Sequence, residues 1–263
     1  MCDQIKLIEN YFSNGMTIAK ISQLTGRSRR WISRELKNLG YKVIPINKIK
    51  HFNEKMFDQI DSEEKAYWLG FLFADGNVGK NDYSISINLQ LEDIEHLKKF
   101  NKFLNYDYNN IKVYSGNHSI YCKFYCKNKH MHSKLLEYGC IPNKSCVMEF
   151  PKEILNSEYF WDFVRGYFDG DGCLTYDKRA GFREPRCSFS CGSKAFIEVL
   201  SKELHQREIG NKISLIKNTY ILKIGNKKWD TNAKFLSIIY KNPSIYLERK
   251  YNKFLNYRGR LVE

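Results

Sequence analysis

The chain has 263 residues, enough for one large domain or for two smaller ones with an appended unit. Its 43 Lys and Arg residues against 29 Asp and Glu give a net charge of +14, which favours a polyanionic partner such as nucleic acid. No apolar run approaches the roughly 18 residues of a membrane-spanning helix, and the first residues lack the pattern of a secretion signal. Eight cysteines without such a signal predict reduced thiols in an intracellular protein.

The first 43 residues predict a small all-α domain. QIKLIENYFSNG is an amphipathic helix pattern, and MTIAKISQLTGRSRRWISRELKNLGY predicts a helix, a glycine-containing turn and a second helix. In a helix-turn-helix the second helix enters the DNA major groove, and here its N-terminal end is basic. A solvated basic helix in a plain three-helix scaffold is the alternative. The expected core is Ile18, Ile21, Leu24, Ile32, Leu36 and Leu39, and the predicted DNA contacts are Arg27, Arg29, Arg30, Ser33 and Arg34.

The rest of the chain predicts a linker and then a repeat. Residues 44–62 change character and predict a linker with one short helical turn. Residues 63–150 and 151–263 then follow the same order of helix-like and strand-like patterns, and each begins with an aromatic-rich segment that ends in Asp-Gly. A period near 100 residues is too long for a solenoid. The predicted fold class is therefore α+β, with two pseudo-symmetric αββαββα repeats after the helix-turn-helix.

Each repeat begins with a predicted helix that contains a glycine, which costs about 1 kcal/mol relative to alanine. Contact between the two helices accounts for this, because Gly70 and Gly166 would leave room where two backbones approach. Asp75 and Asp171 would then lie side by side at the negative ends of the helix dipoles. Mg²⁺ would neutralise this charge, since it is commonly held by one or two carboxylates. Metal-activated water attacking a phosphodiester is the chemistry that such a site favours.

The Asp-Gly segments and a group of Cys and His residues have alternative interpretations. Asp-Gly is a common turn signal, so two plain helix-ending turns are the alternative, although two in register favour the site. DGDG at 169–172 does not fit a calcium loop, because Cys173 and Ala180 stand where oxygen ligands belong. A zinc site is disfavoured by its ligand spacing and by YCKFYCK, which predicts a strand with both thiols on one face. The residues concerned are Cys122, Cys126, His130 and His132.

The segment YSISINLQLE alternates strictly between polar and apolar residues. It predicts a strand whose apolar face packs on helices and whose polar face can hydrogen-bond base edges, although a strand that only faces water would alternate too. Basic residues near the equivalent strands predict salt-dependent phosphate contacts. The predicted contacts of this region are Ser84, Ser86, Asn88, Gln90, Lys123, Lys223, and Arg183 and Arg186 of the basic stretch at 176–186.

WLGFLFADG and VRGYFDGDG resemble the paired motifs of the LAGLIDADG homing endonucleases in their single-chain form. The resemblance covers about residues 50–258 and includes GCIPNKS at 139–145 and IYLERKYNKF at 245–254. It implies a saddle of antiparallel strands that grips double-stranded DNA, with the two motif helices above the cleaved phosphates. It also implies that Asp75 and Asp171 bind the metal and that the basic residues near the scissile groups are Lys144 and Lys250.

Two features depart from the family pattern. Gly170 stands where alanine is usual, and Asp169 adds a carboxylate to which no role is assigned. The helix-turn-helix is not part of the family's core fold, so its role rests on its own sequence.

The predicted function is that of a monomeric, magnesium-dependent, site-specific DNA endonuclease that makes a double-strand break and mobilises an intron, an intein or a free-standing gene. No intein splice-junction residues are evident, which favours a free-standing product. The alternatives are a DNA-binding regulator that has lost cleavage and an RNA-binding maturase. Retention of both acidic residues and both lysines favours the nuclease over the regulator, and the helix-turn-helix weighs against the maturase.

Overall fold

The computed structural model describes residues 2–14, 16–41, 43, 52–106, 110–115, 120–177, 184–225 and 229–258. The chain forms two compact units, Met1–His51 and Phe52–Glu263. Within the described residues, no helix is both long enough and apolar enough to cross a membrane.

The first unit consists of α1 (Cys2–Ser13), α2 (Ile18–Thr25) and α3 (Arg29–Asn38). Gly26, at φ +67°, ends α2 in the left-handed conformation, and the Ser28 hydroxyl accepts from the Trp31 amide to begin α3. This is the helix, turn and helix that the sequence predicts.

The small core of the first unit differs in part from the predicted one. The sequence predicts Leu24 and Leu39 inside, but Leu24 of α2 and Leu39, which follows α3, are 54% and 41% exposed. Ile18 only packs at the edge of the core. The buried residues are Ile8, Ile21, Ile32, Leu36 and Val43, so that α1 and the chain after α3 supply part of this core.

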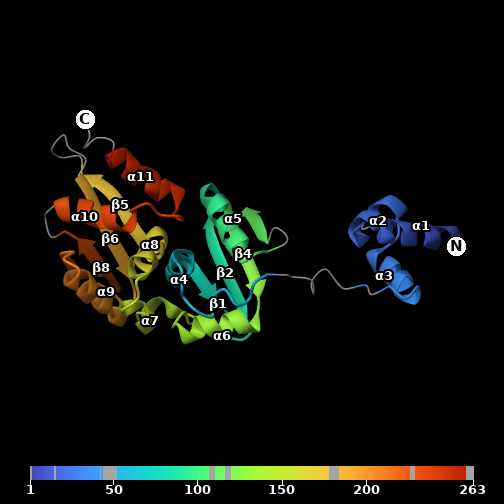
Figure 1. Ribbon diagram of the computed structural model, residues 1–263, viewed down its shortest axis with the longest axis horizontal. Helices are drawn as coiled ribbons and strands as arrows, with labels where there is room; N and C mark the ends of the chain where they lie inside the picture. The colour runs from blue at the N-terminus through green and yellow to red at the C-terminus, as the bar shows by residue number, and fades with distance from the viewer. Residues whose placement is uncertain are drawn as a thin grey trace. The chain divides into compact units, whose positions relative to one another are not determined.

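The second unit contains the two repeats (Figure 1). The first comprises α4 (Glu63–Asp75), β1 (Gly76–Val78), β2 (Ser84–Gln90), η2 (Leu91–Asp93), α5 (Ile94–Phe103), β3 (Ile111–Ser115), β4 (Ile120–Lys127) and α6 (Lys129–Glu137). The second comprises α8 (Phe160–Asp171), β5 (Gly172–Asp177), β6 (Glu184–Cys191), α9 (Lys194–Gln206), β7 (Asn211–Ile216), β8 (Thr219–Ile224) and α10 (Trp229–Ile239). Between the repeats lie η3 (Lys144–Cys146) and α7 (Lys152–Leu155), and α11 (Glu248–Arg258) follows the second repeat.

Each repeat folds into an antiparallel sheet of four strands, in the orders β1-β2-β4-β3 and β5-β6-β8-β7. The registers also correspond, since Gly76 pairs with Ile87 and Gly172 with Phe189. The predicted α+β fold with two αββαββα repeats is confirmed. β5 is longer than β1, so the extra length of the second repeat includes an extended first strand.

One hydrophobic core is shared by both repeats and has α4 and α8 at its centre. The two helices lie side by side between the two sheets (Figure 1). A Cβ atom on Gly166 would lie 1.9 Å from the Tyr67 carbonyl oxygen, and one on Gly70 would lie 2.1 Å from that of Phe163. Only glycine fits at either position, because the obstructing atoms belong to the opposite backbone.

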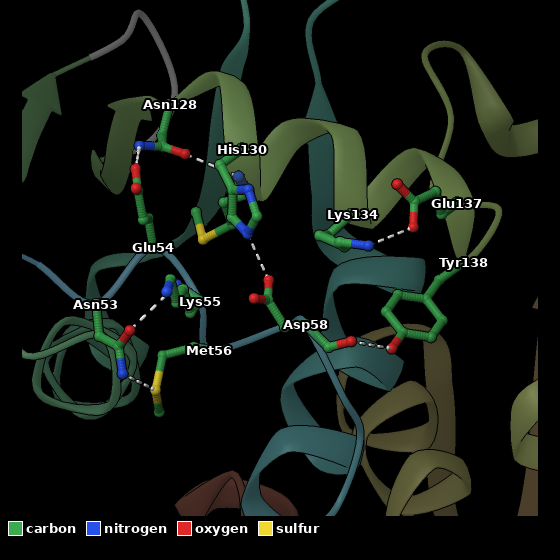
Figure 2. A network of polar contacts seen from close by, with 11 residues as sticks. Asn53, Glu54, Lys55, Met56, Asp58, Asn128, His130, Lys134, Glu137 and Tyr138 are labelled. Carbon is green, nitrogen blue, oxygen red and sulfur yellow. Dashed lines mark hydrogen bonds and ion pairs between the residues drawn. The ribbon is translucent and has the colours of Figure 1, made fainter.

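Residues 52–58, which the sequence places in the linker, pack against the first repeat. Phe57 is fully buried, and the Asn53 amide donates to the Leu104 carbonyl at 2.8 Å. Figure 2 shows polar contacts of this segment with α6, among them the pair of Asp58 with His130. The remainder of the predicted linker includes residues 44–51, which lie outside the described residues.

Candidate active site

The acidic pair stands where α4 and α8 pass directly into strands. Asp75 ends α4 and Asp171 ends α8, and each is followed by a glycine whose amide donates back into the helix. A Cβ atom on the glycine at position 76 or 172 would lie 2.4 or 2.3 Å from the carbonyl oxygen four residues before it. The Asp-Gly pairs are therefore tight helix-to-strand turns, and the same turns set both carboxylates at the helix ends.

Steric contact with α4 explains why a glycine stands at position 170. A Cβ atom at this position would lie 2.3 Å from Ala74 Cβ and 3.2 Å from Asp75 Oδ2. The ends of the two helices are thus so close that an alanine in α8 would displace Ala74. The Asp75 carboxylate itself lies against the end of α8.

The two carboxylates are held in an environment that disfavours their charge. Burial, followed by repulsion from Asp171, raises the pKa of Asp75 to about 6, against the attraction of Lys250, Lys144 and Arg249. The Asp171 side chain reaches solvent, yet desolvation by the surrounding protein still raises its pKa, which the two lysines lower. Two adjacent carboxylates of this kind fit a divalent cation, which removes their repulsion.

The donor set also fits Mg²⁺. No group of three or more His, Cys, Asp or Glu side chains suited to a metal is present among the residues that the structure describes. A pair of carboxylates would leave the remaining octahedral positions to water and to phosphate oxygens, which is the usual arrangement for Mg²⁺ at phosphate chemistry.

The two predicted basic residues lie at the same helix ends but are held differently. Lys250 is 4% exposed, and its ammonium donates to the carbonyls of Phe168, Gly170 and Gly172. All three of its donors are used, and desolvation lowers its pKa to about 8. Lys144 is 9% exposed, and its ammonium donates to the Gly76 carbonyl.

A cavity of about 210 Å³ brings residues of both repeats together beside this pair. Its wall includes Lys144 and Asp171, and the second sheet contributes Ser190 and Thr219. Lys144 therefore reaches the same space as the Asp171 carboxylate. Lys250 is not among the residues that line it.

The outward-facing residues of the sheets form the predicted interface only in part. Asn88 and Gln90 are exposed on β2. Ser84 and Ser86, predicted to read base edges, are only 8% and 3% exposed, so both hydroxyls present little surface to a partner in this structure. The Ser84 hydroxyl donates to Asp82 at 2.6 Å, and Ser86 lies between its partners on β1 and β4.

Lysines face one another across strand pairs in both sheets. Lys112 pairs with Lys123, and Lys212 pairs with Lys223. Like charges directly opposite each other are unfavourable unless an anion lies over them. The second pair lines a groove of about 520 Å³ together with Arg186. Sequence reasoning missed Lys212, although the alternation in KISLIK places it on the same face as Ser214.

Comparison with known proteins agrees with this geometry. Residues 161–239 match a family described as a LAGLIDADG-like domain. The chain carries a LAGLIDADG domain. No curated protein sequence matches it.

Solved structures share its fold over most of its length. The homing endonuclease I-WcaI bound to its DNA recognition sequence aligns over 82% of this chain and 96% of its own, with a TM-score of 0.56 and 16% identity. The LAGLIDADG meganuclease I-AabMI bound to uncleaved DNA aligns over 73% and 88%, with a TM-score of 0.50 and 13% identity. Full-length DUF199/WhiA from Thermotoga maritima aligns over 79% and 64%, with a TM-score of 0.50 and 19% identity. At these identities the likeness establishes the two-repeat LAGLIDADG fold.

Asp169, to which the sequence assigns no role, lies at the centre of a buried network between the LAGLIDADG helices. Its carboxylate accepts from the Tyr67 hydroxyl of α4 at 2.8 Å and from the Tyr240 hydroxyl at 2.6 Å. It also accepts from the Leu247 amide at 2.7 Å, three residues before Lys250. His96 extends the network through the Tyr67 hydroxyl, and burial lowers the pKa of this histidine to about 3.

The cysteines and histidines at which a zinc site is disfavoured have other surroundings. Cys122 and Cys126 are buried, on the same face of β4. His130 contacts Asp58, and His132 contacts the Gly79 carbonyl at 2.7 Å. This agrees with the disfavouring of a zinc site from the sequence.

The arginines in and just before the basic helix of the first unit differ in their contacts. Arg29 and Arg30 are exposed at the start of α3. Arg27 donates to Gln4 at 2.6 Å and stacks on Trp31, and Arg34 pairs with Glu35 at 3.1 Å. Ser33 is partly buried. Arg183 of the second repeat lies outside the described residues.

Proposed function

We propose that the protein is a site-specific DNA endonuclease that makes a double-strand break by metal-dependent phosphodiester hydrolysis. The observation that carries the proposal is the meeting of Asp75 and Asp171 at the ends of two helices whose glycines allow backbone contact. Lys144 lines the same cavity as Asp171. Two sheets that bear facing lysines flank this centre, which suits a duplex bound along both repeats.

Each residue has a definite part in this chemistry. Asp75 and Asp171 would hold Mg²⁺, which when bound supplies an activated water and charge compensation at the scissile phosphate. Lys144 has donors beyond its bond to Gly76 and can stabilise charge that develops on a phosphate oxygen. Lys250 uses all its donors on carbonyls at the turn from α8 to β5, so it acts on the site through its charge and by fixing the helix end. Because one chain supplies both repeats, a monomer is sufficient.

A DNA-binding protein without cleavage is the second candidate. The fold is shared by proteins described as homing endonucleases and by one described only as DUF199/WhiA, so the fold does not assign the reaction. The presence of both carboxylates in a desolvated pair with raised pKa values favours cleavage over binding alone. An RNA-binding maturase is a further alternative on the same fold.

The test is to recover cleaved sites from a randomised duplex library with Mg²⁺ and, separately, with a chelator. On the selected site, Asp75→Asn and Asp171→Asn should each slow double-strand cleavage by at least about 10²–10³-fold, because the metal site is lost. Binding should change little, because the lysines of both sheets remain. The matched control is Asp230→Asn, which changes an exposed carboxylate at the start of α10.

No cut product with Mg²⁺, together with specific binding, would support the regulator instead. Specific capture of structured RNA in preference to duplex DNA would support the maturase. Full cleavage by either Asp variant would remove that residue from the reaction.

A further inference from the structure

Each lysine segment at the site is contacted by the opposite repeat. Lys144 lies near the end of the first repeat, and the loop that bears it packs on the second. Lys250 lies near the end of the second repeat, and the segment that bears it packs on the first. The contacting residues, Asp93 and Ser193, occupy equivalent positions, because each directly precedes the helix after the second strand of its own repeat.

Ser193 holds the Lys144 loop. Its hydroxyl donates to the Met148 carbonyl at 2.6 Å and is buried. The Met148 amide in turn donates to the Lys144 carbonyl at 2.9 Å, which closes the turn. The neighbouring Gly192 is in backbone contact with the same loop, since a Cβ atom there would lie 2.4 Å from the Ser145 carbonyl oxygen.

Asp93 holds the Lys250 segment. Its carboxylate, with a side chain only 6% exposed, accepts from Arg249 Nε at 2.8 Å. It makes no hydrogen bond to the first amides of α5, although it is the residue before that helix. Lys99 of α5 adds a pair with Glu248 and lies 4.8 Å from the centre of the Tyr246 ring. The segment around Lys250 is therefore fixed to α5 of the first repeat.

We propose that Asp93 and Ser193 are positioning residues for the active-site lysines of the opposite repeats, Asp93 for Lys250 and Ser193 for Lys144. This rests on the proposed endonuclease function. Because each residue belongs to one repeat and holds the lysine segment of the other, each half of the site depends on both repeats. Neither carboxylate nor hydroxyl touches the reacting atoms, and each acts through the segment that it holds.

The first test needs neither metal nor DNA. Amide hydrogen exchange of the full chain should show about tenfold faster exchange in residues 144–150 for Ser193→Ala, because the buried hydrogen bond to the Met148 carbonyl is lost. The same hydroxyl accepts from the Phe196 amide, so the first turn of α9 should also exchange faster. Residues 245–254 should be unaffected. Asp93→Asn should show the reverse pattern, with faster exchange in 245–254 and no change in 144–150.

Matched controls remove comparable groups that stay within one repeat. Ser201→Ala deletes a hydroxyl of α9 that donates to Asn211 at 2.6 Å, and Glu95→Gln breaks an exposed pair of α5 with Lys98 at 2.5 Å. Ser193→Thr keeps the hydroxyl and should restore slow exchange. The double variant Asp93→Arg, Arg249→Asp should restore the ion pair with reversed polarity.

The second test follows the two strands of the selected duplex separately, each with its own label. Ser193→Ala and Asp93→Asn should change the ratio of the two nicking rates in opposite directions, by about threefold or more, whereas a general loss of stability would slow both strands alike. The proposal is overturned if both segments respond to both variants, or if neither responds more than in the controls. If each variant speeds hydrogen exchange only in its own segment but the protein cuts no duplex, the positioning roles of Asp93 and Ser193 stand and the proposed endonuclease function is rejected.

Discussion

Lys144 and Lys250 occupy equivalent places in the two repeats, but their surroundings differ in kind. Lys250 donates to two carbonyls of α8 and to that of Gly172, which follows the helix, and the segment before this lysine is fixed by the buried Asp169. Lys144 has one carbonyl partner, and the position in α4 that corresponds to Asp169 is Phe73, a core residue. The second lysine is thus part of the structure of its helix end, and the first retains donors for a ligand.

This difference shows how two copies of one motif can divide their work. A buried carboxylate and a buried ammonium are retained only where each has several hydrogen-bond partners, as Asp169 and Lys250 have. The first repeat replaces this network with an aromatic side chain and keeps its lysine at the edge of the cavity. We therefore expect substitutions of Asp169 and Lys250 to act mainly on stability, and substitution of Lys144 to act mainly on the reaction.

The largest effect is expected for Asp169→Leu. It leaves two buried hydroxyls and the Leu247 amide without their acceptor and should lower the free energy of unfolding by about 3–5 kcal/mol. Phe73→Leu, at the corresponding position, keeps an apolar side chain and should cost about 1 kcal/mol. Urea denaturation of both variants measures the difference. Equal losses would contradict the contrast between the repeats.

The two lysines should separate stability from activity. Lys250→Met leaves three carbonyls without a donor and should lower the free energy of unfolding by about 2 kcal/mol, partly offset by removal of a buried charge. Lys144→Met should change stability less and should slow single-turnover cleavage more, by roughly 10²-fold. Thermal melting and strand-resolved cleavage measure the two quantities. A larger loss of activity for Lys250→Met would assign the ligand-facing role to that lysine.

The sequence predicts the repeats well because their evidence is local. Alternating residues and the two Asp-Gly segments lie within single elements, and the order of patterns is the same in both halves. The solvent exposure of a face is not local. YSISINLQLE correctly places Ile85 and Ile87 inside, but it cannot show that Asp82 and the flanking strands bury the hydroxyls of Ser84 and Ser86.

Contacts between the repeats could not be predicted from the sequence, because they too are not local. Asp93 and Arg249 are 156 positions apart, and Ser193 and Met148 are 45 apart. A serine or aspartate before a helix is usually a cap, so the sequence alone favours a local role for both. Only the packing of α4 on α8 brings each residue to the segment that it holds.

The acidic pair should make the metal-free protein less stable as pH rises. Because the pKa of Asp75 is raised from 3.8 to about 6 by folding, its folded form binds the proton more tightly. The resulting stability is present below about pH 4 and is lost as pH rises through about 6. The full shift corresponds to about 3 kcal/mol, which contact with solvent reduces to about 1–2 kcal/mol.

Asp75→Asn should remove that dependence. Compared with the wild-type protein in chelator, the variant should gain about 1–2 kcal/mol between pH 4 and pH 7 in urea denaturation, with Asp230→Asn as the control. Added Mg²⁺ at pH 7 should stabilise the wild-type protein and not the variant. Parallel stability curves for the two proteins would show that Asp75 is not held in a desolvated pair.

The smallest effect should come from outside both repeats. Arg29 and Arg30 are exposed at the start of α3, and unlike Arg27 and Arg34 they have no hydrogen-bond or ion-pair partner among the described residues of the first unit. If that helix lies on DNA, Arg29→Gln with Arg30→Gln should weaken binding by about tenfold and lower the salt slope by about two, because two phosphate contacts are lost.

The double variant Arg27→Gln, Arg34→Gln, which removes the same charge, should weaken binding less, since those guanidiniums already contact Gln4 and Glu35. Nicking rates at saturating protein should stay unchanged in both, because every residue of the acidic pair and its lysines lies in the second unit. Equal salt slopes for the wild-type protein and both variants would mean that the first unit does not touch the duplex, and a protein partner would then be the better explanation of its basic helix.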